Sequence, residues 1–294
     1  MAISNTSLGT LFALALTTNA CAEATERATW LWKKGADPLG ASAMITSQST
    51  QHTLIDLLQQ QHITAVYGSY GQYTQTQSQA VAQWNQTLAA HGIQSHYLMA
   101  QNTWVFAQNH SKMLNKLQTR LIDYQRNATP DAGFTALHLD IEPHALAEWK
   151  QGTPQSRQAL LWQLIDTFKA IRALLDDQGM TQLKLYADIP TWYDSSAKIG
   201  WVDQGAAFFA ALEEVLDGIS IMAYERDNSA SILNATTDER ALASPTFSVR
   251  LGVDVSNTWQ SPAHLYQVIG ELEAAQQRVD IHDATDYYYW LQAH

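Results

Sequence analysis

Residues 135–144 concentrate ionisable side chains at a regular spacing, reading Thr-Ala-Leu-His-Leu-Asp-Ile-Glu-Pro-His. Side chains alternate between the two faces of a β-strand, so His138, Asp140 and Glu142 are expected on one face, opposite the leucines and the isoleucine. Pro143 lacks the N–H donor that a strand ladder needs, so the strand should stop directly after Glu142. The pattern predicts two carboxyl groups at the C-terminal end of a buried strand.

Two carboxyl groups at this spacing can divide acid and base work between them. Residues two apart on a strand have Cα atoms about 6 to 7 Å apart, so each charge affects the ionisation of the other. One of the two is then expected to keep its proton and act as a general acid. Such a pair is the usual machinery for cleaving a glycosidic bond.

Short apolar runs alternate with longer amphipathic stretches along the rest of the chain. Strands are predicted over Thr29–Lys33, Ile63–Gly68, Gln94–Met99, Ala136–Ile141, Leu183–Ile189, Gly218–Tyr224, Ser248–Val255 and Arg278–Asp283. Helices are predicted over Thr53–Gln61, Gln77–His91, Ser111–Arg126, Gln155–Gln178, Asp203–Leu216, Ser229–Leu242, Pro262–Gln276 and Asp286–Ala293. Alternation of this kind indicates a parallel sheet, because each return to the same edge requires a long crossover.

Eight such units predict an α/β protein with a single-domain (β/α)8 TIM barrel over residues 27–294. Gly92, Gly179 and Gly218 stand where glycine commonly ends a helix before the next strand. The rival architecture, an open doubly wound sheet, should have a glycine-rich turn after its first strand, and residues 32–37 do not supply one.

The predicted strand ends and the loops after them are rich in carboxylates, histidines and aromatic rings. An acidic crevice lined by aromatic rings fits a neutral polyhydroxylated ligand, since ring faces stack on sugars and carboxylates bind hydroxyl groups. The candidate substrate-binding residues are His138, Trp32, Tyr67, Trp104, Asp188, Trp192, Glu225, Asp254, Trp259 and His282.

Composition argues against several other partners. The 294 residues carry a formal net charge of −11 without any run of lysine or arginine, which disfavours nucleic acid and anionic membranes as ligands. A single cysteine excludes an intrachain disulfide framework, and no stretch predicts a transmembrane helix.

The N-terminus predicts export. A mildly apolar run over residues 8–18 is followed by Ala20-Cys21-Ala22, which has the small-x-small form of a cleavage site. We therefore expect a signal peptide over residues 1–22 and a periplasmic or secreted protein. An alternative interpretation is a lipid anchor at Cys21, although residues 16–21 match the bacterial lipoprotein pattern poorly.

Two motifs resemble those of family 18 glycoside hydrolases. The predicted fourth strand is similar to the signature Asp-x-x-Asp-x-Asp-x-Glu, with Asp140 and Glu142 at the last two acidic positions and Thr135 and His138 at the first two. Residues 221–224, Ile-Met-Ala-Tyr, resemble the family's Met-x-Tyr motif on the sixth strand.

The resemblance implies a role for three residues. Glu142 would protonate the leaving oxygen, Asp140 would orient the 2-acetamido group of the substrate, and Tyr224 would help to hold the cyclised intermediate. No cofactor or metal is implied. A histidine at position 138, where the family has an aspartate, changes the charge and hydrogen bonding behind Asp140.

Alternatives to this function remain at the level of sequence. Glu142-Pro143 also resembles the Asn-Glu-Pro of retaining barrel glycosidases, with Asp254 or Glu225 as the second carboxylate. The chain is alternatively a sugar-binding barrel without activity, although the retained Glu142 favours an enzyme.

A metal-dependent hydrolase would use the histidines and carboxylates at 138–144 and 282–283, but the first strand lacks the His-x-His of barrel amidohydrolases. A purely structural interpretation makes the ionisable residues of the fourth strand a buried network that closes the barrel floor.

Overall fold

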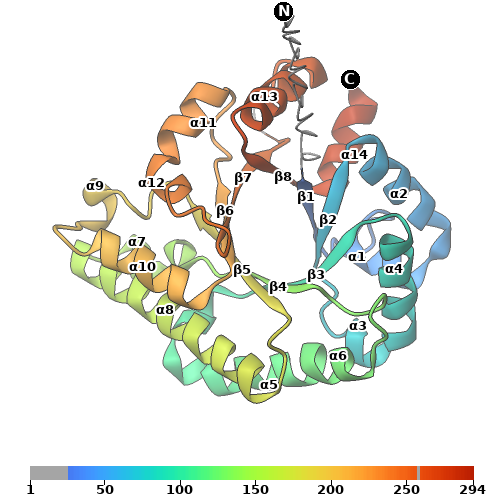
Figure 1. Cartoon of the computed structure of the whole chain (residues 1–294), viewed down its shortest axis with the longest axis horizontal. Coiled ribbons are helices and arrows are strands. Elements are labelled where there is room, and N and C mark those ends of the chain that lie inside the picture. The colour runs from blue at the N-terminus through green and yellow to red at the C-terminus, as the bar shows by residue number, and fades with distance from the viewer. Residues whose placement is uncertain (1–25, 257–258) are drawn as a thin grey trace, which may run out of the picture.

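The structure, a computed structural model, describes residues 26–256 and 259–294, so the predicted signal peptide and Cys21 lie outside the described residues. Eight parallel strands form a closed barrel in chain order, and β1 pairs with β8 to complete the ring (Figure 1). The strands are β1 Arg27–Leu31, β2 Ile63–Gly68, β3 Gln94–Ala100, β4 Ala136–Asp140, β5 Lys184–Pro190, β6 Gly218–Met222, β7 Ser248–Asp254 and β8 Arg278–His282.

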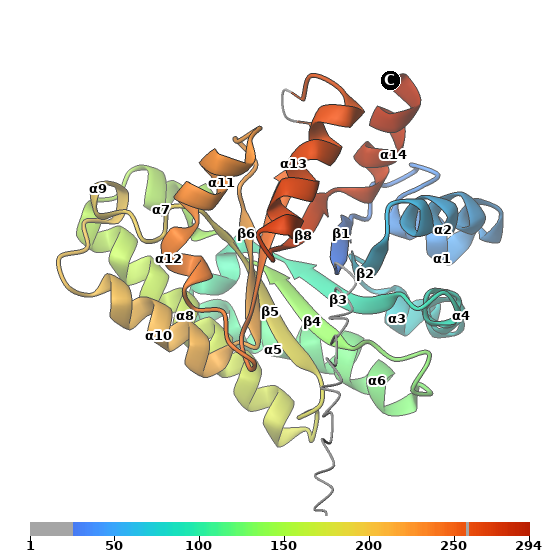
Figure 2. The ribbon, with the colours of Figure 1, turned by 45° about the horizontal axis from the view of Figure 1, so that its top comes forward.

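Helices surround the barrel on its outside (Figures 1 and 2). The longer ones are α2 Gln51–Gln60, α4 Ser78–Ala90, α5 His110–Leu117, α8 Pro154–Asp177, α10 Gly205–Val215, α11 Ser229–Ala235, α13 Pro262–Ala274 and α14 Ala284–Ala293. Short helices in the connections are α1 Ala41–Thr46, α3 Tyr73–Thr76, α6 Asp123–Asn127, α7 Ala147–Lys150, α9 Ser196–Ile199 and α12 Thr237–Arg240. Within the described residues, no helix is long and apolar enough to cross a membrane.

The predicted (β/α)8 barrel is therefore confirmed, with differences at element ends. The predicted helix over residues 111–126 is divided by a π-helical stretch, and the one over residues 229–242 is split into α11 and α12. Five strands end earlier than predicted: β1 at Leu31, β4 at Asp140, β6 at Met222, β7 at Asp254 and β8 at His282. Glu142 and Tyr224 therefore lie beyond the ends of their strands, which changes how the candidate site is built.

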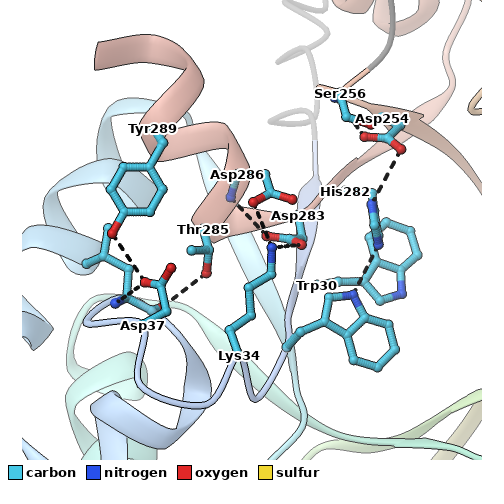
Figure 3. Close-up of polar contacts among 12 residues, drawn as sticks. Trp30, Lys34, Asp37, Asp254, Ser256, His282, Asp283, Thr285, Asp286 and Tyr289 are labelled. Atoms are coloured by element: carbon cyan, nitrogen blue, oxygen red, sulfur yellow. Dashed lines mark hydrogen bonds and ion pairs between the residues drawn. The ribbon is translucent and has the colours of Figure 1, made fainter. Parts of the chain in front are cut away.

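Local sequence sets the ends of the helices that frame the site. Thr153 and Ser261 accept hydrogen bonds from backbone N–H groups in the first turns of α8 and α13, each of which begins with a proline. Asp283 caps α14 in the same way and also pairs with Lys34 at 2.9 Å (Figure 3).

Two apolar clusters hold the barrel. The larger one lies between the strands and the surrounding helices, and the smaller one comprises Ala28, Trp30, Ala65, Tyr67 and Leu98 from β1, β2 and β3. Polar and charged side chains that fill the remaining interior are almost completely buried, which is costly unless they are paired.

Candidate active site

Asp140 is the last residue of β4, where it pairs in register with Ala100 of β3. Its Oδ1 atom is buried and has no hydrogen-bond partner among the described residues. Burial, followed by the charges of Asp188 and Glu142, raises the pKa of Asp140 well above its usual range, and His282 opposes this shift. Asp140 is therefore a carboxyl group that tends to keep its proton.

Glu142 lies just beyond the strand, so the prediction that it ends β4 was wrong. The backbone N–H of Glu142 donates to Oδ1 of Asn102, at 2.8 Å, in place of a ladder bond. The side chain is 28% exposed, so it remains accessible, and burial of the rest raises its pKa above the ordinary value despite His282. This residue combines access to a ligand with an increased proton affinity.

His144 lies beside Glu142, although its position after Pro143 suggested an ordinary loop residue. Nε2 of His144 is 3.7 Å from Oε2 of Glu142, and Nδ1 is 3.1 Å from the hydroxyl oxygen of Tyr193. Burial, with further contributions from Lys150 and Lys198, lowers the pKa of His144 to about 4. A neutral imidazole therefore faces the glutamate at neutral pH and does not neutralise its charge.

His138, on β4, and Asp188, on the neighbouring strand β5, have side chains only 1% exposed. Nε2 of His138 is 2.6 Å from Oδ1 of Asp188, and Nε1 of Trp30 donates to Oδ2 of Asp188 at 3.0 Å. The Tyr67 ring stacks on the His138 ring with centroids 3.9 Å apart. We call Trp30, His138, Asp140, Glu142 and Asp188 the acid cluster.

A second set of buried polar residues fills another part of the barrel. Asp280, which is fully buried, accepts hydrogen bonds from Nε of Arg250 at 2.6 Å, from the Tyr67 hydroxyl at 3.1 Å and from the Ser220 hydroxyl. We call these four residues the arginine cluster. Its one anion is matched by one cation and by two further donors.

His282, which lies close to Asp254, is next to Trp30 of the acid cluster (Figure 3). Nδ1 of His282 is 3.8 Å from Oδ2 of Asp254, and Nε1 of Trp32 donates to Nε2 of His282 at 3.1 Å. Burial alone would raise the pKa of Asp254, but His282 and the backbone N–H of Ser256 hold it below the ordinary value. Asp254 is therefore an ionised carboxylate.

Tyr224 follows the end of β6 and faces the same region. Its ring centroid lies 6.2 Å from that of Trp30 and 4.9 Å from that of His282. Gly252 on β7 makes this packing possible, since a Cβ atom there would lie 3.1 Å from Tyr224 Cε1 and 3.3 Å from Trp30 Cη2. Burial and the charges of Asp188 and Asp140 raise the pKa of Tyr224, so its hydroxyl keeps its proton.

The other predicted substrate-binding residues do not all reach this region. Trp104 and Trp259 are 4% and 6% exposed, and the Trp259 indole donates to the Asp254 carbonyl at 2.7 Å. Tyr67 is 1% exposed and lies within the barrel. These rings offer little free face to a sugar, because neighbouring side chains already cover them. A substrate-binding role for them stays a prediction.

Trp192 and Glu225 line an open cleft of about 720 Å³ over the loops after β5 and β6. Nζ of Lys198 lies 4.4 Å from the centroid of the Trp192 ring. The Trp192 ring also lies 5.1 Å from His144, so the cleft adjoins the glutamate side of the acid cluster, although neither Asp140 nor Glu142 lines it.

The predicted catalytic and substrate-binding residues did not include Trp30, His144, or Arg250, Asp280 and Ser220 of the arginine cluster. Side-chain alternation places Trp30, Arg250 and Asp280 on the inward faces of their strands. Polar side chains at inward-facing positions within the strands, and not only at their ends, could therefore have identified these residues from the sequence. Within residues 26–256 and 259–294, no three histidine, cysteine, aspartate or glutamate side chains are arranged to hold a metal ion.

No family model and no curated protein sequence matches the chain. Among solved structures, the C-terminal domain of a putative chitinase from Desulfitobacterium hafniense DCB-2 superposes with a TM-score of 0.53 at 13% identity, covering 79% of this chain and 66% of that one. An exo-beta-1,4-mannosidase from Opitutaceae bacterium strain TAV5 superposes with a TM-score of 0.55 at 11% identity, covering 88% of this chain and 51% of that one. The chain thus shares the (β/α)8 barrel fold of these two proteins while spanning less than two thirds of either.

Proposed function

We propose that this chain is a glycoside hydrolase in which Glu142 is the general acid. The observation that carries the proposal is the pair Asp140 and Glu142, one at the C-terminal end of β4 and one just beyond it, both with raised pKa and Glu142 accessible. Proton-holding carboxyl groups at the C-terminal end of a parallel barrel are what acid-assisted cleavage of a glycosidic bond requires.

The resemblance to family 18 supports a substrate-assisted route. The acetamido oxygen of the substrate attacks the anomeric carbon while Asp140 orients the acetamido group, and the glycosidic C–O bond breaks as Glu142 gives its proton to the leaving oxygen. Water then opens the cyclised intermediate and returns a proton to Glu142. Tyr224 has a protonated hydroxyl beside Asp140 with which to hold that intermediate.

A two-carboxylate mechanism is the second candidate, because Asp254 is an ionised carboxylate near the same region. Substrates separate the two routes. Only 2-acetamido sugars permit attack by the acetamido oxygen, so chitin and peptidoglycan fragments should be cleaved on the first route. Cleavage of deacetylated or galactosamine-containing polymers at comparable rates would favour Asp254.

Replacing the general acid tests the proposal directly. Glu142→Gln keeps the size of the side chain but removes its transferable proton, so we expect the rate on an unactivated glycan to fall by at least roughly 10²-fold. Glu148→Gln makes the same change at an exposed position on α7 and should leave the rate unchanged. A near-wild-type rate for Glu142→Gln with an intact fold would refute the assignment.

The same variant distinguishes an enzyme from a sugar-binding barrel. A catalytically silent protein would bind oligosaccharide in both forms and cleave it in neither, which calorimetry and product analysis would detect together. Export of the mature protein also remains part of the proposal. It is tested by N-terminal sequencing of the protein recovered from the periplasm or medium, with residue 23 expected first.

A further inference from the structure

We propose that Asp188, on β5, is a positioning residue for Asp140, and that it holds the buried negative charge which keeps Asp140 protonated. The inference rests on the proposed function, because Asp140 is the carboxyl group that orients the substrate there. It assigns Asp188 and His138 to the support of the site rather than to contact with substrate. The inference rests on the hydrogen bonds that His138 and Trp30 make with Asp188.

Asp188 is placed to remain a carboxylate. Its Oδ1 lies 2.6 Å from Nε2 of His138 and its Oδ2 accepts from Nε1 of Trp30 at 3.0 Å, so both oxygens face donors. Donors on both oxygens favour the charged form of a carboxyl group. Burial raises the pKa of Asp188 well above its usual range, against the Trp30 hydrogen bond and His282. With the His138 proton on Nε2, however, a protonated Asp188 would leave an acid O–H pointing at one of these two donors, so the geometry favours the carboxylate.

His138 supplies a donor without supplying a positive charge. It is 1% exposed, and burial lowers its pKa to about 3, so the ring is neutral. We assign its one proton to Nε2, the nitrogen that faces Asp188. Nδ1 has no partner among the described residues, as expected of an unprotonated nitrogen in this tautomer. The nearest buried guanidinium, Arg250, is already paired with Asp280. His282 is then the cation that acts on Asp188, and it does so against the charges of Asp280 and Glu142.

Asp140 receives the effect of that charge. Its buried Oδ1 lacks a partner, and the ionisable side chains around it come from four other parts of the fold as well as β4. These side chains are Glu142, Asp188, His282, Tyr193 and Tyr224. Two of them, Asp188 and Glu142, are carboxyl groups whose charges raise the pKa of Asp140, and His282 lowers it. A protonated Asp140 has an O–H that it can share with Glu142 or with the ligand.

Carboxyl ¹³C NMR of the free protein tests this without any substrate. In aspartate-labelled protein, Asp140→Asn and Asp188→Asn assign the two carboxyl resonances by their loss. We expect the wild type to show Asp188 as a carboxylate at a pH where Asp140 is still an acid. In Asp188→Asn, the titration of Asp140 should move to lower pH, because a neighbouring negative charge is gone.

His138→Gln is the matched control, since an amide N–H can still donate to Asp188 while the imidazole is lost. The Asp140 titration should then stay near that of the wild type. A titration that moves in His138→Gln but not in Asp188→Asn would overturn the proposal. If Asp188→Asn does not fold, Asp188→Glu assigns the resonance instead, because it keeps the charge and removes the labelled aspartate. Wild-type spectra that show Asp188 protonated while Asp140 is ionised would refute the proposal.

A rate measurement then links the inference to the proposed activity. Loss of protons from the Asp140–Glu142 pair should set the alkaline limb of the pH–rate profile, so Asp188→Asn should move that limb to lower pH and reduce the rate on the order of tenfold above it. A purely structural role would lower Tm without moving the limb. Because the NMR titration needs no turnover, an inactive protein would refute the glycosidase proposal without deciding the role of Asp188.

Discussion

The acid cluster and the arginine cluster lie in the same barrel, and each contains a carboxylate that is almost fully buried. In the arginine cluster, Asp280 is matched by one guanidinium and two hydroxyl donors. In the acid cluster, His138 adds no cation, and Asp140 keeps a buried oxygen without a partner among the described residues. Both clusters therefore bury ionisable groups. They differ in whether those groups have hydrogen-bond and charge partners.

That difference separates stabilising interactions from reactive ones. A buried pair with all its hydrogen bonds made holds strands together and resists change of protonation. A cluster with unsatisfied atoms and shared protons costs stability, and such costs are found at functional sites. A closed, purely structural network of buried groups therefore describes the arginine cluster. It does not describe Asp140 and Glu142, the residues of the predicted fourth strand for which it was considered.

Breaking the arginine cluster should produce the largest change in stability. Arg250→Met leaves the Asp280 carboxylate buried without its cation, which should cost about 3–5 kcal/mol of the free energy of unfolding. Urea denaturation measures this. Adding Asp280→Asn should recover much of the loss, because the buried charge is then removed. If the Arg250→Met variant were as stable as the wild type, the stabilising role of the arginine cluster would be contradicted.

Glu239 provides a test of whether a buried carboxyl group without hydrogen-bond partners must have a catalytic role. It is fully buried on α12, outside the barrel, and neither of its oxygens has a partner among the described residues. Burial, with Asp194 and Asp238, raises its pKa from 4.5 to about 7, against its own backbone N–H and Arg226.

The folded state therefore retains a proton that the unfolded state loses, so stability should fall as pH rises from about 4.5 to about 7. Glu239→Gln should remove this dependence and gain up to about 3 kcal/mol over wild type at the upper end of the window. Equal pH dependence of the two proteins in urea titrations would show that Glu239 is solvated. The Glu239→Gln variant should retain the wild-type rate of glycan cleavage. That result would show that a buried carboxyl group without hydrogen-bond partners is not by itself a catalytic group.

The acid cluster should show the opposite balance of stability and rate. Asp140→Asn removes an ionisable group whose Oδ1 makes no hydrogen bond within the described structure, so the free energy of unfolding should be unchanged or higher. Its rate should fall roughly 10²-fold, equivalent to about 2.7 kcal/mol, because an amide orients the acetamido group poorly. Asp280→Asn is the comparison: stability should fall while the rate per folded molecule is retained.

Periodicity in the sequence predicted the barrel, the strand order and the place of Asp140 on β4, because side-chain alternation and chain reversal are local properties. It placed Glu142 on the strand as well, whereas the strand ends two residues earlier. The pairing of His138 with Asp188, and of Arg250 with Asp280, depends on register between neighbouring strands, which local patterns do not encode. The same limit applies to Trp259. Its position in a loop predicted stacking on sugar, but the local pattern does not show that its indole N–H donates to the Asp254 carbonyl.

The smallest expected effects compare one donor from each cluster. Tyr67→Phe removes one of the three donors to Asp280, so it should cost about 1 kcal/mol and leave the pH–rate profile in place. Trp30→Phe removes one of two donors to Asp188, which weakens the carboxylate form and should shift the alkaline limb to lower pH. Lost packing also lowers the stability of Trp30→Phe, so the limb, and not Tm, is the readout that separates the two variants. A limb that moves in Tyr67→Phe instead would mean that the arginine cluster, whose charges the geometry shows as balanced, sets the protonation of the site.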